Sequence, residues 1–574
     1  MDKSVETQAV PESLEGGLLG PLPVVMKYLR KLKVRDIIDA AAPSDPRHKV
    51  THGECIEALL CSIFLKNHTL SHVSQTLSAY DLPAIFGKPG VQAELFHDYR
   101  LGEALDALYG KTEALYAEVV FRGLEAFQIA LKRLHLDSTT VSLHGQYVGA
   151  FDPLACLIKE PPRPDYGKSK DHRDDLKQLV MSLTVGDYGG PVYGRVTHGN
   201  TSDVEEFRHH LDSLAGMLGD LRDTLLVADC KLCTGPTLAQ AFDLGFNLVT
   251  LVPETFKIRA ALINQACRES LTFLKETETG EIYHGKSFKV PYTLEIPGQE
   301  DRQVFLRFLV IHSSDLERQR RETTRRAAEK ESKRLEKEVL RRQAKVSYAC
   351  LADAEQEANQ IIGAAAAKHH QIGFQVEEFT EVKKRRGRQP AQESPVTVQR
   401  FRIHWTIQAN PSTISVPGTF SPSGMYVLLT TISDRRSLSD LQVLNAYKGQ
   451  EVVERGFHWL KGPLRVAPVF LKSCERIDVL GFVYLISMFV YALVQRDVRM
   501  RLKEQDATLP SPAGPRSDRP TAWGLFLLLE HLTILRFRSG PRTQIFARNF
   551  NKVQMEILDK CGWTALYFQP EKTT

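Results

Sequence analysis

Apolar residues recur at three- and four-residue spacings from about residue 22 to residue 127. This spacing predicts a series of amphipathic helices. Thr51 lies where the N-cap of one helix is expected, and Ser71 is placed to cap a short helix that ends near Leu77. Two short helices this close together are consistent with a helix-turn-helix or with an ordinary helical bundle.

The hydrophobic period changes after residue 129. Short apolar runs bounded by turn residues predict strands at 130–137, 178–185, 191–197, 224–229 and 247–252. The sequence DYGG between the second and third runs predicts a hairpin. Ser202 and Glu205 form a capping-box pattern at the start of a helix, and Thr234 begins another. The order strand, hairpin, helix, strand, helix, strand predicts an α/β sheet with mixed strand directions.

The regular pattern ends between residues 254 and 424. Strands are predicted there at 272–295, 304–312 and 400–408. The segment Asp315–Gln343 is rich in Arg and Glu with few apolar positions, which is typical of a solvated surface helix. Lys383–Arg388 reads KKRRGR. It is either a basic loop that touches phosphate or a flexible solvated loop.

Short apolar runs typical of buried elements occur again from about residue 425. A strand is predicted at 425–431, followed by a long helix from about Ser437 and an almost wholly apolar helix at Val479–Val494. This apolar run is shorter than the roughly 18–20 residues that cross a bilayer, and charged residues flank it. We therefore predict a buried helix and no membrane span. A proline-containing linker at 507–520 precedes a helix and a small appendage.

These patterns divide the chain into six parts. They are a flexible tail (1–20), a helical N-terminal domain (21–128), the first half of an α/β core (129–253), an inserted subdomain with a basic helix (254–424), the second half of the core (425–505), and a linker with a C-terminal segment (506–574).

Composition narrows the class of protein. The chain has 574 residues, 43% apolar and 25% charged, which excludes wholesale disorder, a collagen-like repeat and a disulfide-rich mini-protein. A net charge of +5 does not by itself indicate nucleic-acid binding. The nine cysteines have no regular spacing, and the single pair Cys230 and Cys233 has no second pair to complete a zinc site. Without a signal peptide at the N-terminus, we expect free thiols and a cytoplasmic location.

Two aspartates carry the first candidate chemistry. Asp137 and Asp229 each end a predicted strand of one sheet. An acid at a strand end often serves only as a cap or a turn. Two such acids on one sheet instead form the paired carboxylates that a hard divalent cation requires.

A third acid, Glu454, lies in a predicted helix that also carries three other polar residues of interest. At about 100° per residue, Tyr447, Gln450, Glu454 and Lys461 fall within a stripe roughly 60° wide. Such a stripe is either the solvent face of an amphipathic helix or a surface for metal and phosphate. The neighbouring apolar helix favours the second interpretation.

Together these residues resemble the DDE triad of bacterial insertion-sequence transposases, in particular the insertion-sequence-four superfamily. Asp137, Asp229 and Glu454 correspond to the triad, and the helix is similar to the family signature Y-x2-R-x3-E-x6-K. Gln450 stands where the signature has Arg. The segments 169–173 (SKDHR) and 199–203 (GNTSD) look like motifs that flank the first half of such domains.

The resemblance implies an α/β RNase H-like mixed-sheet catalytic core with an inserted subdomain, preceded by a helical N-terminal domain. It further implies two Mg²⁺ ions, replaceable by Mn²⁺, held by Asp137, Asp229 and Glu454 for DNA strand cleavage and strand transfer. Tyr447, Lys461 and, more weakly, Gln450 would contact DNA.

The implied partners are double-stranded DNA, as the terminal inverted repeats of the element and as target, and a second copy of the chain on paired ends. The implied setting is the bacterial cytoplasm, in association with the nucleoid. Two alternatives remain open: a structure-specific nuclease on the same fold that cuts but never joins, and a non-catalytic DNA-binding relative.

Overall fold

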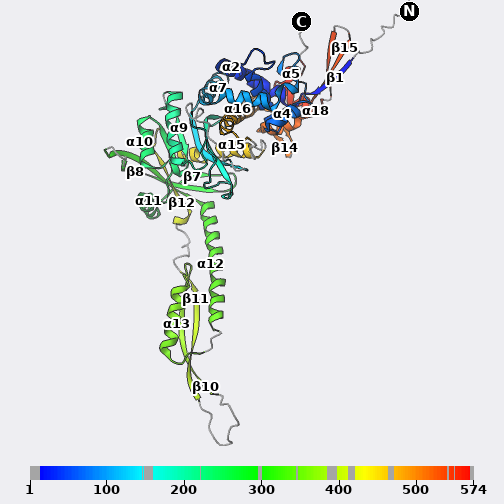
Figure 1. Ribbon diagram of the computed structural model, residues 1–574. Helices are drawn as coiled ribbons and strands as arrows, with labels where there is room; N and C mark the ends of the chain where they lie inside the picture. The colour runs from blue at the N-terminus through cyan, green and yellow to red at the C-terminus, as the bar shows by residue number, and fades with distance from the viewer. Residues whose placement is uncertain are drawn as a thin grey trace, which may run out of the picture. The chain divides into compact units, whose positions relative to one another are not determined.

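The computed structural model describes residues 13–144, 147, 159–219, 221–294, 300–343, 347–383, 397–410, 420–462, 471–512, 514–539, 542–548 and 550–568. The chain forms two units (Figure 1). The first contains residues 1–253, 290–307 and 429–574, and the second contains residues 254–289 and 308–428. The predicted basic segment Lys383–Arg388 lies, beyond Lys383 itself, outside the described residues.

The N-terminal part of the first unit is helical, as predicted. Its helices are α1 (Leu22–Lys31), α2 (Val34–Ala41), α3 (His52–Phe64), α4 (Leu70–Leu77), α5 (Leu82–Phe86), α6 (Asp98–Leu108) and α7 (Thr112–Ala126). Thr51 caps α3 and forms a capping box with Glu54. The prediction that Ser71 caps the next helix is wrong, because α4 follows Thr69 and Ser71 lies inside its first turn. All of α3 is buried, so it forms the centre of these helices, and the helix-turn-helix stays a prediction.

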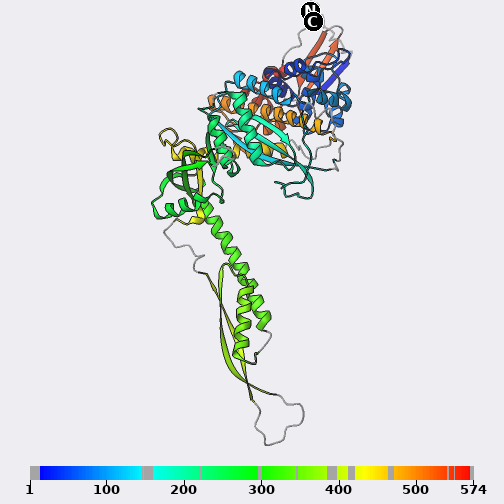
Figure 2. The ribbon, with the colours of Figure 1, turned by 60° about the vertical axis from the view of Figure 1, so that its left-hand side comes forward.

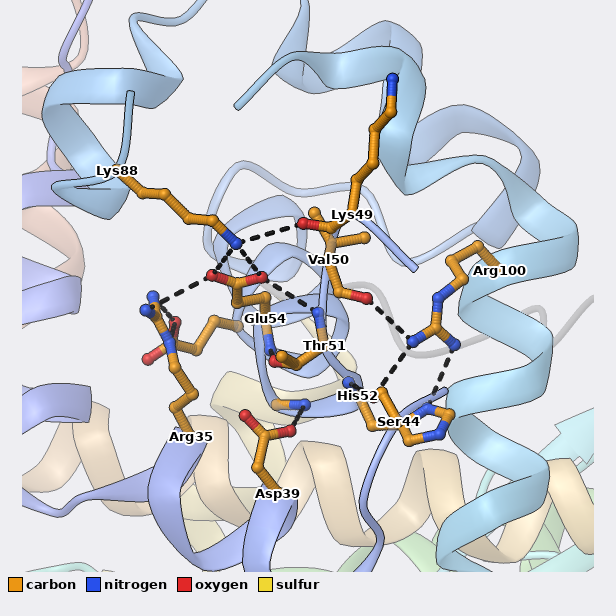
Figure 3. A network of polar contacts seen from close by, with 12 residues as sticks. Arg35, Asp39, Ser44, Lys49, Val50, Thr51, His52, Glu54, Lys88 and Arg100 are labelled. Atoms are coloured by element: carbon orange, nitrogen blue, oxygen red, sulfur yellow. Dashed lines mark hydrogen bonds and ion pairs between the residues drawn. The ribbon is translucent and has the colours of Figure 1, made fainter. Parts of the chain in front are cut away.

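Charged side chains hold the N-terminal end of α3 in place (Figure 3). The Lys88 ammonium donates to both carboxylate oxygens of Glu54 at 2.9 Å, and Arg35 approaches the same carboxylate at 3.6 Å. Arg35 Nε also donates to Glu57 at 2.8 Å. On the other side, Arg100 donates to the Val50 carbonyl at 3.0 Å. These contacts offset the cost of burying charge in the helical region.

Glu57 makes this network sensitive to pH. Burial raises the pKa of Glu57 from 4.5 to about 7, although Arg35 acts in the opposite direction. A raised pKa means that the folded state holds the proton more tightly, so this stabilisation is complete below pH 4.5 and is lost as the pH rises through about 7. We expect the free energy of unfolding of the wild type, relative to Glu57→Gln, to fall by on the order of 1–3 kcal/mol between about pH 5 and pH 8.

Urea unfolding at the two pH values measures this difference. The matched control is Glu125→Gln, which changes an exposed carboxyl group on α7. A difference between wild type and Glu57→Gln that does not change with pH would contradict the prediction.

The core sheet of the first unit has the strand order β4-β3-β2-β5-β6. The strands are β2 (Arg133–Leu143), β3 (Lys177–Gly186), β4 (Pro191–Thr197), β5 (Leu225–Ala228) and β6 (Asn247–Leu251). β3 is antiparallel to both of its neighbours, whereas β2, β5 and β6 are parallel. The DYGG hairpin joins β3 to β4 as predicted. This mixed order confirms the predicted RNase H-like fold class.

Helices α9 (Asp203–Leu218) and α10 (Gly235–Asp243) connect the later strands of this sheet. Thr234 caps α10 as predicted, accepting from the Thr237 N–H at 3.4 Å. The predicted capping box at α9 is wrong: Ser202 occupies the N-cap position, but its side chain makes no cap hydrogen bond. The first turn of α9 instead directs Asp203 toward β2, where Ser138 Oγ donates to it at 2.6 Å.

The long helix predicted from about Ser437 is two helices, α14 (Asp440–Lys448) and α15 (Glu451–Lys461). The break falls at Gly449 and Gln450. A Cβ atom at Gly449 would lie 3.2 Å from a ring carbon of His135 on β2, a tight contact that a residue with a side chain could make only if its neighbours shifted by a few tenths of an ångström. Glycine also weakens a helix interior. The polar stripe predicted on one straight helix is therefore divided between two.

Helix α16 (Cys474–Glu504) contains the predicted buried helix at Val479–Val494. By length and composition it could cross a membrane, but 94% of its most apolar stretch is buried inside the protein. It packs against α1, α3, α6, α7 and β4. The prediction of a core helix is confirmed by this burial.

The two ends of the chain pair with each other in the first unit. β1 (Ser13–Leu18) is antiparallel to β15 (Thr533–Ser539), which pairs in turn with β16 (Arg542–Arg548). The prediction of a flexible tail is therefore wrong for Ser13–Leu18, because a distant strand supplies its hydrogen-bond partners. The remaining C-terminal elements are β13 (Leu509–Ser511), β14 (Gly514–Ser517), α17 (Ala522–Leu529), α18 (Lys552–Lys560) and α19 (Thr564–Phe568).

The second unit corresponds to the inserted region of the sequence. Its elements, some of which extend into the first unit, are α11 (Lys257–Arg268), β7 (Thr272–Glu276), β8 (Ile282–Leu294), β9 (Arg302–Ser313), α12 (Ser314–Gln343), α13 (Leu351–Ala364), β10 (His370–Val382), β11 (Thr397–Ala409) and β12 (Met425–Thr430). The strand predicted at 272–295 is a hairpin of β7 and β8. The strand β10 was not predicted.

Within this unit the hairpin of β10 and β11 lies beside α12 and α13 (Figures 1 and 2). Ala354, Ala358 and Ile403 form the buried centre of this packing. The predicted charged helix α12 is confirmed. Its Arg325 pairs with Glu322 and Glu329 along the helix, so the positive charge of this arginine is already neutralised.

Candidate active site

Asp137 lies within β2 and not at its end, which corrects the sequence prediction. β2 continues to Leu143 and keeps its antiparallel pairing with β3 throughout. Its parallel pairing with β5, however, stops at Leu136 opposite Ala228. Asp137 is therefore the first residue of β2 beyond the end of β5, with a half-buried side chain.

Asp229 follows Ala228 directly, at the end of β5 as predicted. Because Leu136 is opposite Ala228, the register places Asp137 and Asp229 side by side. Asp229 Oδ1 accepts from the Lys231 N–H at 3.0 Å. Burial raises the pKa of Asp229, and the negative charge of Asp137 raises it further. Two carboxylates that repel each other in this way favour a cation between them.

Glu454 comes from α15, which packs against β2 and β3. Its side chain is exposed. Tyr447, at the end of α14, lies near both Glu454 and Asp229. Burial raises the pKa of Tyr447 to about 12, and the charges of Asp229 and Glu454 both contribute to the rise. Tyr447 therefore lies within electrostatic reach of both acids, while Gln450 occupies the N-cap position of α15.

The donor chemistry of these residues suits a hard divalent cation, because Mg²⁺ prefers carboxylate oxygens and keeps several waters. Among the described residues, no group of three or more His, Cys, Asp or Glu side chains lies close enough to hold a metal ion. The structure thus brings Asp137 and Asp229 together, and Glu454 as a third ligand stays a prediction.

Two lysines and a third aspartate surround the pair and were not recognised from the sequence. Lys170 Nζ lies 3.3 Å from Asp137 Oδ1 and 3.2 Å from Ser138 Oγ. Ser138 Oγ in turn donates to Asp203 Oδ1 at 2.6 Å, and Lys231 forms an ion pair with Asp203. The SKDHR and GNTSD motifs supply Lys170 and Asp203, so these motifs were the available signal.

Lys461 is also tied to the SKDHR segment. Its ammonium donates to both carboxylate oxygens of Asp171, at 2.7 and 2.9 Å. Both side chains are partly exposed. Lys461, the last residue of the predicted polar stripe, therefore contacts the SKDHR segment, whose Lys170 contacts Asp137.

The described cysteines are free, and Cys156 lies outside the described residues. Cys230 is half-buried next to Asp229, and Cys233 is buried. Burial raises the pKa of both thiols, which favours their neutral form. Neither cysteine takes part in a metal-binding group among the described residues.

Residues 131–487, more than half of the chain, match the family described as "Transposase DDE domain". The chain belongs to this family. Residues 17–121 match a domain of unknown function, DUF4277. No curated protein matches the chain in sequence.

A solved structure titled "Mos1 transposase paired-end complex with left transposon end" is similar at 9% sequence identity, over 36% of this chain and 60% of that chain. The TM-score is 0.14. The matched residues of this DDE transposase-domain protein include β2, β5 and α15, which carry Asp137, the approach to Asp229, and Glu454.

Proposed function

We propose that the protein is a DNA transposase of the insertion-sequence-four superfamily that cleaves the ends of its element and joins them to target DNA. The observation that carries the proposal is the adjacency of Asp137 and Asp229 where β5 ends, in the RNase H-like sheet of a transposase DDE domain. At this edge of a sheet, side chains face outward and ligands bind in open α/β folds.

Asp137 and Asp229 would hold divalent metal, with Glu454 as third ligand, and two Mg²⁺ ions replaceable by Mn²⁺. When bound, such metal activates the attacking oxygen and stabilises the leaving 3′ oxygen of an in-line displacement. The carboxylates would position the metal. The backbone N–H of Lys231 donates to Asp229 Oδ1 at 3.0 Å and so keeps the Asp229 side chain in place.

Lys461, Tyr447 and Gln450 are the proposed contacts to DNA near the cleaved end. Lys461 binds a phosphate as a point charge. Gln450 can donate a hydrogen bond but adds no charge, so its contact is weaker than that of the Arg in the family signature. The DNA partners would be the terminal inverted repeats and the target, bound by a homodimer in the bacterial cytoplasm, in association with the nucleoid. The helical N-terminal domain is the candidate for end recognition.

A strand-transfer reaction tests the proposal. The full-length protein is incubated with Mg²⁺, a labelled duplex from the end of the element that encodes it, and a supercoiled target plasmid. Label joined to the plasmid supports the transposase. Cleavage without joined product would favour a structure-specific nuclease, and binding without any cleavage would favour a non-catalytic relative.

A further inference from the structure

We propose that two adjacent residues of opposite charge fill the ligand sites of the free protein: Lys170 takes the place of the metal cation at Asp137, and Asp171 takes the place of a DNA phosphate at Lys461. Metal and DNA would then bind by exchange with these two side chains. The inference rests on the proposed function, and it concerns the SKDHR loop, to which that function gives no role.

Lys170 is bound in the manner of a cation. Its ammonium lies 3.3 Å from Asp137 Oδ1 and 3.2 Å from Ser138 Oγ, and it also donates to the Ser138 carbonyl oxygen. An ammonium has three N–H donors, so three oxygens match its full capacity. The backbone N–H of Lys170 donates to Thr140 Oγ1 on β2 at 2.9 Å, which fixes the loop beside the strand that carries Asp137.

The charges around Lys170 support this assignment. The Lys170 ammonium also lies within electrostatic reach of Asp229, so its charge acts on both candidate ligands. A divalent ion carries twice the charge of the ammonium at the same carboxylates and therefore competes well against it. Lys170 would keep the aspartates neutralised until metal arrives.

Asp171 is bound in the manner of a phosphate. Both of its carboxylate oxygens accept from Lys461 Nζ, at 2.7 and 2.9 Å. The loop is shaped for this contact, because the Asp171 N–H donates to Ser169 Oγ at 3.2 Å and the Ser169 N–H donates to Asp174 at 3.0 Å. The Asp171 and Lys461 side chains are 41% and 28% exposed, so solvent weakens the pair and a DNA phosphate can replace it.

The two exchanges are linked because Lys170 and Asp171 are neighbours in sequence, about 3.8 Å apart at their Cα atoms. Displacing Lys170 from Asp137 loosens the same short segment through which Asp171 holds Lys461. Metal binding would therefore make Lys461 more available to DNA, and by linkage DNA would strengthen metal binding.

The first test measures Mn²⁺ affinity by electron paramagnetic resonance on the full-length protein. If the ammonium occupies the site about nine-tenths of the time, Lys170→Met should lower the apparent Kd about tenfold. Lys168→Met is the matched control, because Lys168 is an exposed lysine of the same loop whose charge also reaches Lys231. Unchanged or weaker binding in Lys170→Met, or an equal gain in Lys168→Met, would overturn the proposal. Absence of Mn²⁺ binding in the wild type would instead overturn the proposed function.

The second test measures DNA affinity by fluorescence anisotropy with a duplex and no added metal. Asp171→Asn should tighten binding by about three- to tenfold, because Lys461 is released. The gain should disappear when Lys461→Met is combined with it. Asp175→Asn, the same charge change at an exposed residue of this loop that pairs with Arg173 and not with Lys461, controls for general repulsion. An equal gain in Asp175→Asn, or a gain that persists without Lys461, would overturn this half of the proposal.

Discussion

Replacing Asp229 by Asn is expected to reduce metal-dependent DNA cleavage more than about 100-fold, since loss of a ligand costs more than the 10- to 100-fold typical of residues that support ligands. Asparagine keeps the size of the side chain and an oxygen for the Lys231 N–H, but it removes the negative charge. Asp137→Asn should have a similar effect, because the pairing of β2 with β5 places the Asp137 and Asp229 carboxylates side by side. Cleavage rates on a plasmid carrying the ends of the element, with Mg²⁺, measure the loss.

Asp223→Asn is the matched control for these two variants. Asp223 is an exposed residue in the turn before β5, so its substitution changes the same charge without reaching the site. We expect it to cleave like the wild type. If Asp229→Asn retained more than about a tenth of the wild-type rate, the assignment of Asp229 as a metal ligand would be wrong.

Phe489→Ala is expected to lower the free energy of unfolding by about 3–5 kcal/mol, the range for removing a buried Phe. Phe489 on α16 is fully buried, and its ring meets that of Tyr188 in the β3–β4 turn edge-on at 6.3 Å. It also fills the space beside Gly123 on α7, where an added Cβ would lie 2.5 Å from the ring. Its loss would leave a cavity between the N-terminal helices, the sheet and α16. Urea unfolding measures the change.

Met500→Ala on the same helix provides the comparison. Met500 is 42% exposed, so its removal leaves no closed cavity and should change the free energy of unfolding by about 0.5 kcal/mol or less. A Phe489→Ala variant as stable as Met500→Ala would contradict the account of α16 as the helix that joins these layers.

The strands of the core were predictable because most are short apolar runs. The position of Asp229 follows from this rule, since the run TLLVAD changes from apolar to acidic at the end of β5. The rule failed at Asp137. Ser138, Thr139 and Thr140 continue β2 although they are polar, and all three are buried. Ser138 Oγ donates to Asp203, and Thr140 Oγ1 accepts from the Lys170 N–H. A pattern of hydrophobic residues does not reveal such contacts with the loops of the site.

Other features depend on partners that are distant in sequence. At the break between α14 and α15, Gly449 comes close to His135 on β2. The hydrophobic period of the helix does not reveal this contact, because His135 is distant in sequence. β1 is a strand only because β15, near the other end of the chain, pairs with it. Lys170 and Asp203 were visible as members of motifs, but their contacts with Asp137 and Ser138 required the folded sheet.

The most direct test of the central claim concerns Glu454, because the fold alone does not bring it into a three-carboxylate group. Supercoiled plasmid carrying the ends of the element is incubated with Mg²⁺ and wild type, Glu454→Gln or Glu451→Gln, the last being an exposed acid one turn earlier on α15. We expect cuts at the element ends with wild type and Glu451→Gln and none with Glu454→Gln. Undiminished cutting by Glu454→Gln would contradict the claim that Asp137, Asp229 and Glu454 form one metal-dependent active site.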